Sequence, residues 1–343
     1  MHRTYTIIIV TWNALSHLKT FLPSVTETDY PDFEIIIANN ASTDGTKEWV
    51  QDHYPDIRIV TFSENFGYCG GNNRASDYAT GEIIVFLNND VEVDPDWLKN
   101  LDNAFDREQV AAAQPKLKAC ADPDSFEYAG AAGGYLDFYG YPFCRGRIFD
   151  TVEKDTGQYD NPEEILWASG AALAIRKNIF YTMGKFDEDF EFHMEEIDLC
   201  WRLWNRGFEV VCEPASVVYH LGGGSLPVGS TRKIYYNYRN NLIMMIKNLP
   251  EKKVFIRILT RLILDGISGL RSLLKLKPME TAAIIRAHFA FYGQLPGSLK
   301  KRRELQKVRT SSGDPSVMLN KSIVTEYYVF GKKTYMEIMA EEN

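Results

Sequence analysis

Four short apolar segments in the first hundred residues each end in a polar loop, and segments with helical spacing separate them. Strands that alternate with helices in this way predict a parallel, doubly wound α/β sheet. Loops at the carboxyl ends of such strands converge on one crevice, the expected position of a nucleotide. The four segments are residues 4–13, 33–46, 56–67 and 82–90.

The fourth segment ends in three polar side chains, Asn88, Asn89 and Asp90, directly after the apolar run 83–87. Asn and Asp favour turns, so a simple turn is one interpretation. The other interpretation is a metal site at the carboxyl edge of the sheet, where open α/β folds bind their ligands. Features further along the chain decide between the two.

Size and charge limit the classes of protein to consider. The 343 residues suffice for one large and one smaller domain or for two ordinary domains, and the composition is that of a soluble globular protein. The net charge of -8 conceals a basic block, because residues 247–309 carry fifteen Lys and Arg against four acids. That block has a charge of +11 and the remainder about -19, a contrast that usually marks a negatively charged partner.

The cysteines and the N-terminus indicate a cytosolic protein. Five scattered cysteines form no CxxC pair, which favours reduced thiols over disulfides or a zinc site. The chain enters its first apolar segment almost at once, without the features of a signal peptide.

The middle of the chain is less regular. Glycines and aromatic residues within 110–165 predict a long flap or extended loops over the crevice. A helix is predicted over HMEEIDLCWRLWNRGF, with Ile197, Trp201 and Trp204 on one face. Two short strands should follow and end at His220.

Seven sequence blocks in this order resemble the family 2 glycosyltransferases, and the rhamnosyltransferase-like branch in particular. Each block is weak alone, but the ordered set is specific, and it covers about residues 4–245. The blocks are VTWN, ANNASTDGT, ENFGYCGGNN, FLNNDVEVDPDWL, ASGAALAIR, FDEDFEFHMEEIDLCWR and VYHLGGGS.

The resemblance implies a GT-A fold, a mostly parallel doubly wound α/β sheet with a C-terminal helical extension. The catalytic domain would cover residues 1–245, with a nucleotide-sugar half at about 1–100 and an acceptor half at about 101–245. Residues 246–343 would form a basic, amphipathic helical region.

Sugar transfer from a nucleotide donor requires that the leaving diphosphate be neutralised, and a divalent cation such as Mn²⁺ or Mg²⁺ does this with few protein ligands. Asp90 fits as the carboxylate ligand, and Asn88 or Asn89 as weaker oxygen ligands. The family often has an acid at the position of Asn88, so the identity of the metal stays open. The resemblance implies that His220 completes the metal site; a histidine that only closes a strand is the alternative.

The resemblance also implies a nucleoside site at the first strand ends. Trp12 would stack on the base, and Asn39 stands where the family usually has the acid that binds the base edge. Asp44 would bond the ribose or cap the next helix. The full predicted set is Thr11, Trp12, Asn13, Asn39, Asp44, Asn65, Gly67, Asn72 and Asn89.

An inverting transfer needs one general base for the acceptor hydroxyl. The family's catalytic acid maps onto Glu196, with Glu195 as its close competitor. Asp198 is grouped with the acceptor residues, although its spacing to Arg202 favours an i,i+4 ion pair. Ordinary helix N-terminal acids are the alternative for this cluster.

The acceptor half contributes one further predicted set. Trp167, Ser169 and Gly170 would shape the sugar pocket, an aromatic wall beside small residues. A core tryptophan under the sheet is the alternative for Trp167.

Within the basic block, Lys253, Arg257, Arg261 and Asp265 repeat every four residues and place charges on one stripe of a helix. One interpretation is a helix that lies in a membrane interface and is held there by anionic lipid. The alternative is a helix that packs on the catalytic domain or forms a contact between copies of the chain. Its charges interrupt it too often for a membrane span. Thin aromatic interleaving disfavours nucleic acid.

These features predict an inverting, metal-dependent glycosyltransferase, peripheral on the cytoplasmic face of the cell membrane. It would move a sugar, such as rhamnose from dTDP or a sugar from UDP, to a lipid-linked or cell-surface glycan. A nucleotidyltransferase is one alternative, although VTWNALSH lacks the Gly-rich, basic loop usual there. A non-catalytic sugar-nucleotide or glycan-binding protein is the other, and it would tolerate replacement of Glu195 and Glu196.

Overall fold

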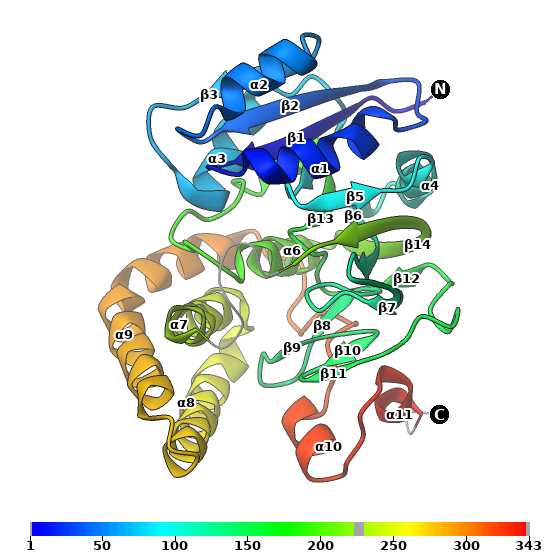
Figure 1. Cartoon of the computed structure of the whole chain (residues 1–343). Coiled ribbons are helices and arrows are strands. Elements are labelled where there is room, and N and C mark those ends of the chain that lie inside the picture. The colour runs from blue at the N-terminus through cyan, green and yellow to red at the C-terminus, as the bar shows by residue number, and fades with distance from the viewer. Residues whose placement is uncertain (1, 223–229, 341–343) are drawn as a thin grey trace.

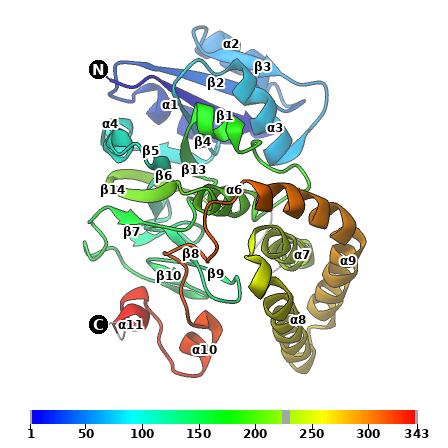
Figure 2. The same cartoon turned by 180° about the vertical axis from the view of Figure 1, so that it is seen from behind.

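A computed structural model describes residues 2–222 and 230–340 of the chain (Figure 1). The α/β layer that contains the N-terminus lies at the top of the view, and the long helices α7, α8 and α9 lie in the lower half, to the left of the strands β8 to β11. Figure 2 shows the same arrangement from behind.

The first four strands form the parallel sheet that the sequence predicts. Their order is β3-β2-β1-β4, and every neighbouring pair is parallel. The strands are β1 (Tyr5–Thr11), β2 (Phe33–Asn39), β3 (Arg58–Thr61) and β4 (Ile83–Leu87), and the helices between them are α1 (Leu15–Thr26), α2 (Thr46–His53) and α3 (Gly67–Ala75). The predicted alternation of strand and helix is therefore confirmed.

The sheet continues beyond β4 with mixed directions. β13 is antiparallel to β4 and to β6, whereas β14 is parallel to β6. These strands and their neighbours are β5 (Val91–Val93), β6 (Val110–Ala119), β7 (Asp122–Phe126), β12 (Glu163–Glu164), β13 (Ala172–Arg176) and β14 (Glu209–His220).

Alternation along β1 places hydrophobic side chains on both faces of the sheet, as a doubly wound fold requires. Ile8 packs with Phe86 in one core cluster, and Ile7 and Ile9 pack with Leu18 of α1 in the other. Helices cover both faces, which leaves the carboxyl ends of the strands as the accessible edge.

Two predictions about the middle of the chain are wrong. Residues 110–119 form the mostly buried strand β6 instead of part of a flap. The strand was missed because its alanines and Pro115 give a weak strand signal in the sequence. The two strands expected before His220 are one strand, β14, whose pairing with β6 shifts between Glu213 and Val217.

Much of the remaining part of the expected flap is a separate small sheet. Its order is β11-β10-β9-β8, and most of its side chains are buried. Its strands are β8 (Gly134–Leu136), β9 (Pro142–Cys144), β10 (Arg147–Ile148) and β11 (Thr151–Val152).

The predicted amphipathic helix is α6 (Glu195–Asn205), in which Ile197 and Trp201 are buried and Trp204 packs against the same core. The helix ends as a glycine C-cap requires. Gly207 has φ of 79°, and the Phe208 N–H donates to the Leu203 carbonyl at 3.1 Å.

The C-terminal part is helical, as predicted. α7 packs along α9, and α8 connects the two (Figures 1 and 2). The expected domain boundary near residue 245 lies inside α7, and the division into domains stays a prediction. The helices not yet given are α4 (Trp97–Asp102), α5 (Lys177–Thr182), α7 (Thr231–Asn248), α8 (Glu251–Leu274), α9 (Pro278–Lys307), α10 (Ile323–Tyr328) and α11 (Tyr335–Met339), with 3-10 turns at Ser76–Tyr78 and Asn103–Asp106.

None of the helices in the described ranges is both long and apolar enough to cross a bilayer.

Candidate active site

Two adjoining cavities lie at the carboxyl edge of the sheet. The first, here the β1–β4 cavity, has a volume of about 390 Å³ and lies at the ends of β1 and β4. The second, the α6 cavity, has a volume of about 490 Å³ and lies between β14 and the start of α6. Both are lined by Tyr68, Asn88, Asp90 and Phe192, so the polar end of β4 forms their common wall.

Most of the residues predicted for the nucleotide line the β1–β4 cavity. Trp12 is half exposed there, as a stacking platform for a base requires. The predicted residues in its lining are Trp12, Asn13, Asn65, Gly67, Asn72, Asn88, Asn89 and Asp90. Their positions agree with the prediction, and their roles remain predictions.

Three predicted nucleotide residues, Thr11, Asn39 and Asp44, lie outside this lining, and their nucleotide roles stay predictions. Thr11 and Asn39 are buried, and the Asn39 side chain accepts a hydrogen bond from the Ser42 N–H at 2.9 Å. Asp44 accepts from the Leu15 N–H at 2.9 Å and from the Thr46 hydroxyl at 2.6 Å. Asp44 therefore caps helices, which was the alternative interpretation.

Asn40 lines the cavity where Asn39 was expected. Its amide donates to the Asn65 side chain at 2.8 Å and to the Gly67 carbonyl at 3.1 Å, and it accepts from the Phe66 N–H at 2.9 Å. Asn40 therefore fixes the loop before α3. The sequence could have indicated it, since it is the next residue of the same ANNAS block.

The predicted metal residues come together at the common wall. The Asp90 carboxylate lies 3.2 Å from His220 Nε2, and both side chains are buried. On the other side of the ring, Glu127 Oε1 lies 3.3 Å from His220 Nδ1. Glu127 is a residue that sequence reasoning missed, because it belongs to the segment expected as a flap. A carboxylate behind a histidine is the usual way to orient a metal-binding imidazole.

The charges of this trio perturb one another. Burial alone would raise the pKa of Asp90, but the hydrogen bond and charge of His220 lower it below its usual value. Burial alone would lower the pKa of His220, but Asp90 and Glu127 raise it to about 10. A cation bound to this imidazole would compete with its proton.

This donor set fits a hard divalent cation whose remaining ligands are oxygens of water and of a bound phosphate. Asp90 supplies a carboxylate, His220 an imidazole nitrogen and Asn88 an amide oxygen beside both cavities. Across residues 2–222 and 230–340, no group of three or more His, Cys, Asp or Glu side chains is arranged to hold a metal ion by itself. A cation here would thus depend on the oxygens of a bound diphosphate.

Glu195 and Glu196 begin α6 and both line the α6 cavity. In the described part of the protein, the Oε2 atom of each is buried and lacks a hydrogen-bond partner. Burial raises the pKa of Glu196 to about 7, and burial together with the charge of Glu196 raises the pKa of Glu195. A carboxylate with a pKa near neutrality is suited to accept a proton.

The backbone before these acids is held in an unfavourable conformation. His193 and Met194 have φ of 66° and 76°, a region that residues with a Cβ rarely adopt. The Asn240 amide on α7 donates to the Phe192 carbonyl at 2.7 Å and to the His193 carbonyl at 2.9 Å. Strain maintained by the surroundings in this way is typical of active sites.

The acceptor residues divide into two groups. Ser169 and Gly170 line the α6 cavity, as predicted. Trp167 does not: it is buried, and its Nε1–H donates to the Tyr135 carbonyl at 2.9 Å. A Cβ on Gly134 would meet the Trp167 ring at 2.1 Å, so the ring is a core element. The alternative interpretation of Trp167 is thus the better one.

Asp198 lies in the core as well, which corrects its place in the acceptor set. Its carboxylate accepts from Arg202 Nε at 2.9 Å, the predicted i,i+4 pair, and from the Asn248 amide at 2.8 Å. Lys247 Nζ lies 2.8 Å from the same carboxylate. Asp198 therefore joins α6 to the end of α7.

We expect Asp198→Ala to lower the free energy of unfolding by about 3–5 kcal/mol, because it leaves the buried cations Arg202 and Lys247 short of a counter-charge. Denaturant unfolding followed by circular dichroism measures the change. Glu304→Ala is the matched control: it removes an exposed pair with Lys307 and should change little. Equal stability of the two variants would contradict the structural role of Asp198.

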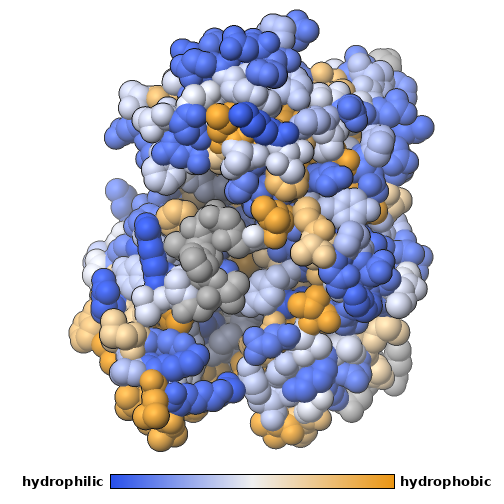
Figure 3. Space-filling model, viewed as in Figure 1, coloured by the Kyte–Doolittle hydropathy of each residue, from blue (hydrophilic) through white to orange (hydrophobic). Residues whose placement is uncertain are grey.

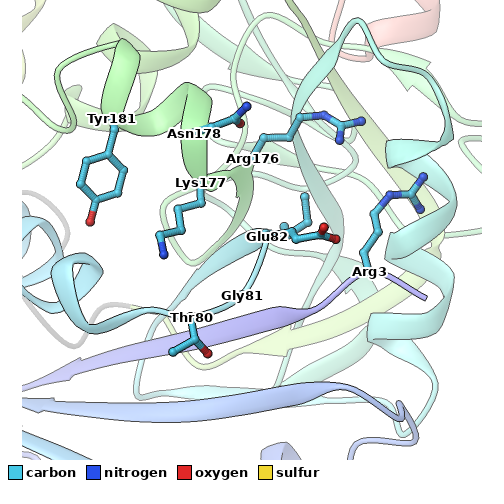
Figure 4. A pocket seen from close by; sticks show the side chains of 9 residues that line it. Arg3, Thr80, Gly81, Glu82, Arg176, Lys177, Asn178 and Tyr181 are labelled. Carbon is cyan, nitrogen blue, oxygen red and sulfur yellow. The ribbon is translucent and has the colours of Figure 1, made fainter. Parts of the chain in front are cut away.

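A larger cavity, of about 820 Å³, lies at the opposite edge of the sheet (Figure 4). Its cations are engaged in the fold. Arg3 donates to the Phe105 carbonyl and Arg176 to the Val110 carbonyl, both at 2.8 Å, and Lys177 donates to the Ala79 carbonyl. This edge holds the amino ends of the parallel strands β1 and β4, whereas open α/β folds bind nucleotides at the carboxyl ends.

Comparison with known proteins relates the chain to sugar-transferring enzymes. The sequence profile of Glycosyl transferase family 2 matches residues 6–161. The O-antigen biosynthesis protein RfbC of Myxococcus xanthus is 32% identical over 207 residues, which are 59% of this chain and only 16% of that protein. The N-acetylglucosaminyl-diphospho-decaprenol L-rhamnosyltransferase of Mycobacterium tuberculosis is 28% identical over 232 residues, 62% of this chain and 75% of that protein.

Solved structures agree on the fold. A mannosyltransferase, PcManGT from Pyrobaculum calidifontis, solved with GDP-Man and Mn²⁺, superposes with a TM-score of 0.53 at 17% identity, over 85% of this chain and 88% of that one. The GT-A fold expected from the sequence is thereby confirmed.

Proposed function

Because the chain is a family 2 glycosyltransferase of the rhamnosyltransferase-like kind, we propose that it transfers a hexose or deoxyhexose, with inversion, from a nucleoside-diphosphate donor to a hydroxyl of a glycan acceptor. The observation that carries the proposal is the common wall of two cavities. One cavity suits a nucleotide, the other is lined by the buried Glu195 and the half-buried Glu196, and Asp90 lines both.

The donor would lie in the β1–β4 cavity. Trp12 stacks on the base, while Asn65, Gly67 and Asn72 bring polar groups and backbone to the ribose and phosphates. Asp90, Asn88 and His220 would hold a divalent cation, Mn²⁺ or Mg²⁺, which when bound would neutralise charge on the leaving diphosphate. The Pyrobaculum enzyme, described with GDP-Man and Mn²⁺, supports the choice of a divalent ion.

The acceptor would lie in the α6 cavity, beside Ser169 and Gly170. Glu196 takes the proton from the acceptor hydroxyl while the hydroxyl oxygen attacks the anomeric carbon of the donor sugar. The bond from that carbon to the diphosphate breaks on the opposite face, so the configuration inverts. The neighbouring carboxylate of Glu195 lines the same cavity and is the competing candidate for the base.

For the finer identity, we propose dTDP-rhamnose as donor and a lipid-linked glycan as acceptor. The mycobacterial relative is named as an L-rhamnosyltransferase acting on N-acetylglucosaminyl-diphospho-decaprenol, which supports both choices. With such an acceptor, the enzyme would work at the inner face of the cell membrane, and residues 247–309 would contact the membrane. Self-association through the same region is the alternative.

The test is a transfer assay with purified protein, Mn²⁺ and N-acetylglucosaminyl-diphospho-polyprenol, in which dTDP-rhamnose, a UDP-sugar and GDP-mannose are supplied separately. We expect a mass increase of the lipid with dTDP-rhamnose, abolished by EDTA, and an anomeric configuration by NMR opposite to that of the donor. Metal-dependent nucleotide binding without product from any of the donors would favour a non-catalytic binding protein.

A further inference from the structure

The charged stripe of α8 points into the protein instead of toward a partner. Arg257 and Asp265 are 1% and 0% exposed, and Arg261 is buried beside them. Arg257 forms a bidentate pair with Asp314 at 2.7 and 2.9 Å, and Arg261 Nε donates to Asp265 at 2.7 Å. These charges are neutralised inside the fold, so the predicted basic face does not meet lipid.

The apolar side of α8 is consequently turned outward. Phe255 is 78% exposed, and large aliphatic side chains continue along the helix on the outside. An apolar stripe of this length on a soluble surface usually marks an interaction site. Its exposed members on α8 are Phe255, Ile256, Leu259, Ile263, Ile267, Leu270, Leu273 and Leu274.

The turn between α8 and α9 is the most exposed part of this surface. Leu274 and Leu276 are 77% and 89% exposed, and Met279 follows them at the start of α9. Lys275 and Lys277 alternate with these apolar residues. Apolar side chains that insert, flanked by lysines that meet phosphate groups, are the features of a segment at a bilayer interface.

A second apolar surface adjoins this hairpin. Val329 and Phe330, after α10, are strongly exposed. The Arg271 guanidinium of α8 lies 4.9 Å from the Tyr328 ring, which places the two surfaces side by side. In Figure 3, hydrophobic atoms gather at two places along the same lower end of the molecule, over the regions of α8 and α10. Two surfaces at one end suit a planar partner.

A groove adjoins the hairpin. It has a volume of about 290 Å³, lies between the starts of α7 and α9, and is lined by Met279, Arg232 and Arg286. Arg232 lies 5.3 Å from the ring of Phe192, which borders both catalytic cavities. The path of a lipid-linked acceptor from the hairpin would thus pass Arg232 and Arg286, cations that suit phosphate.

Charge distinguishes lipid from a second copy of the chain. The exposed charges around the tip of the hairpin are mostly positive, so two copies that met through this surface would bring like charges together. They belong to Arg271, Lys275, Lys277 and Arg286. An anionic bilayer is complementary to the same residues. We propose that the α8–α9 hairpin and the adjoining end of α10 insert their apolar faces into the interface of an anionic bilayer, with 274–276 deepest. Only the path of the acceptor depends on the proposed function.

The test is flotation of the full chain with vesicles of phosphatidylcholine alone or mixed with phosphatidylglycerol. We expect the protein to float with the mixed vesicles, and the double variant Leu274→Glu/Leu276→Glu to reduce the bound fraction at least about tenfold. Lys47→Glu, an equal charge change of two on exposed α2, is the matched control and should float like the original protein.

Sedimentation velocity without lipid completes the test. The proposal is overturned if the original protein binds neither vesicle, if Lys47→Glu loses binding as strongly as the leucine variant, or if the chain is a dimer that only the leucine variant disrupts. Nucleotide binding is measured separately on each variant and should not change. A loss of flotation therefore cannot be mistaken for failure of the donor site.

Discussion

Replacing Glu196 with Gln is expected to lower kcat by about 10²- to 10⁴-fold while leaving the Kd for the nucleoside diphosphate unchanged. The amide keeps the size of the side chain but cannot take the proton of the acceptor hydroxyl. Glu196 lines the α6 cavity, and its Oε2 atom lacks a partner among the described residues. The amide oxygen of Gln can still accept from the backbone N–H groups of residues 196 and 197 that bond the carboxylate. Steady-state kinetics with nucleotide calorimetry measures both quantities.

The pH profile gives an independent readout for the same residue. A base must be deprotonated, so kcat should rise as the pH passes through the pKa of about 7 of Glu196. Glu195→Gln is the matched variant, because it stands next in the chain and shares the pocket. If Glu195→Gln loses the larger part of kcat and Glu196→Gln keeps the profile, the roles of the two acids are reversed; if neither variant changes kcat, the base assignment fails.

The second large effect is expected for Asp90→Ala, which removes the only carboxylate on the wall common to the two cavities among the described lining residues. Loss of a residue that merely orients a metal ligand costs 10- to 100-fold in metal affinity, so loss of the ligand itself should cost at least about 100-fold. Nucleoside diphosphate should then bind equally with and without Mn²⁺. Calorimetric titration in Mn²⁺ and in EDTA measures this difference.

Two comparisons sharpen that experiment. Asp96→Ala removes an exposed acid shortly after β5 and should leave the effect of Mn²⁺ on nucleotide binding intact. Glu127→Gln should weaken metal binding less than Asp90→Ala, because Glu127 acts through His220 at 3.3 Å. Retention of metal-dependent binding in Asp90→Ala would remove Asp90 from the metal site.

The nucleotide half of the fold was predictable because its signals are local. Each apolar run and the polar loop after it stand within one short segment, and β4 with Asn88 to Asp90 is the clearest case. Strand β6 was hidden, since its alanines and Pro115 lack the β-branched side chains that mark a strand. For α8, periodicity identified the charged stripe but not its direction, which depends on the partner Asp314.

The site shows the same division. Asp90 and His220, far apart in the chain, were expected together only through the family resemblance, and they lie together in the fold. Asn39 and Asn40 differ by one position at a strand end, and alternating sides of the strand decide which one reaches the cavity. Trp167 and Asp198 appeared functional because motifs contain them, but burial shows their structural role.

The most direct measurement is the anomalous scattering of Mn²⁺ in crystals grown with the nucleoside diphosphate that binds. We expect one strong peak within coordination distance of the Asp90 carboxylate and the His220 imidazole, in contact with the diphosphate. A bound nucleotide with its Mn²⁺ elsewhere, or with no peak beside Asp90, would contradict the metal site on which the proposed transfer depends.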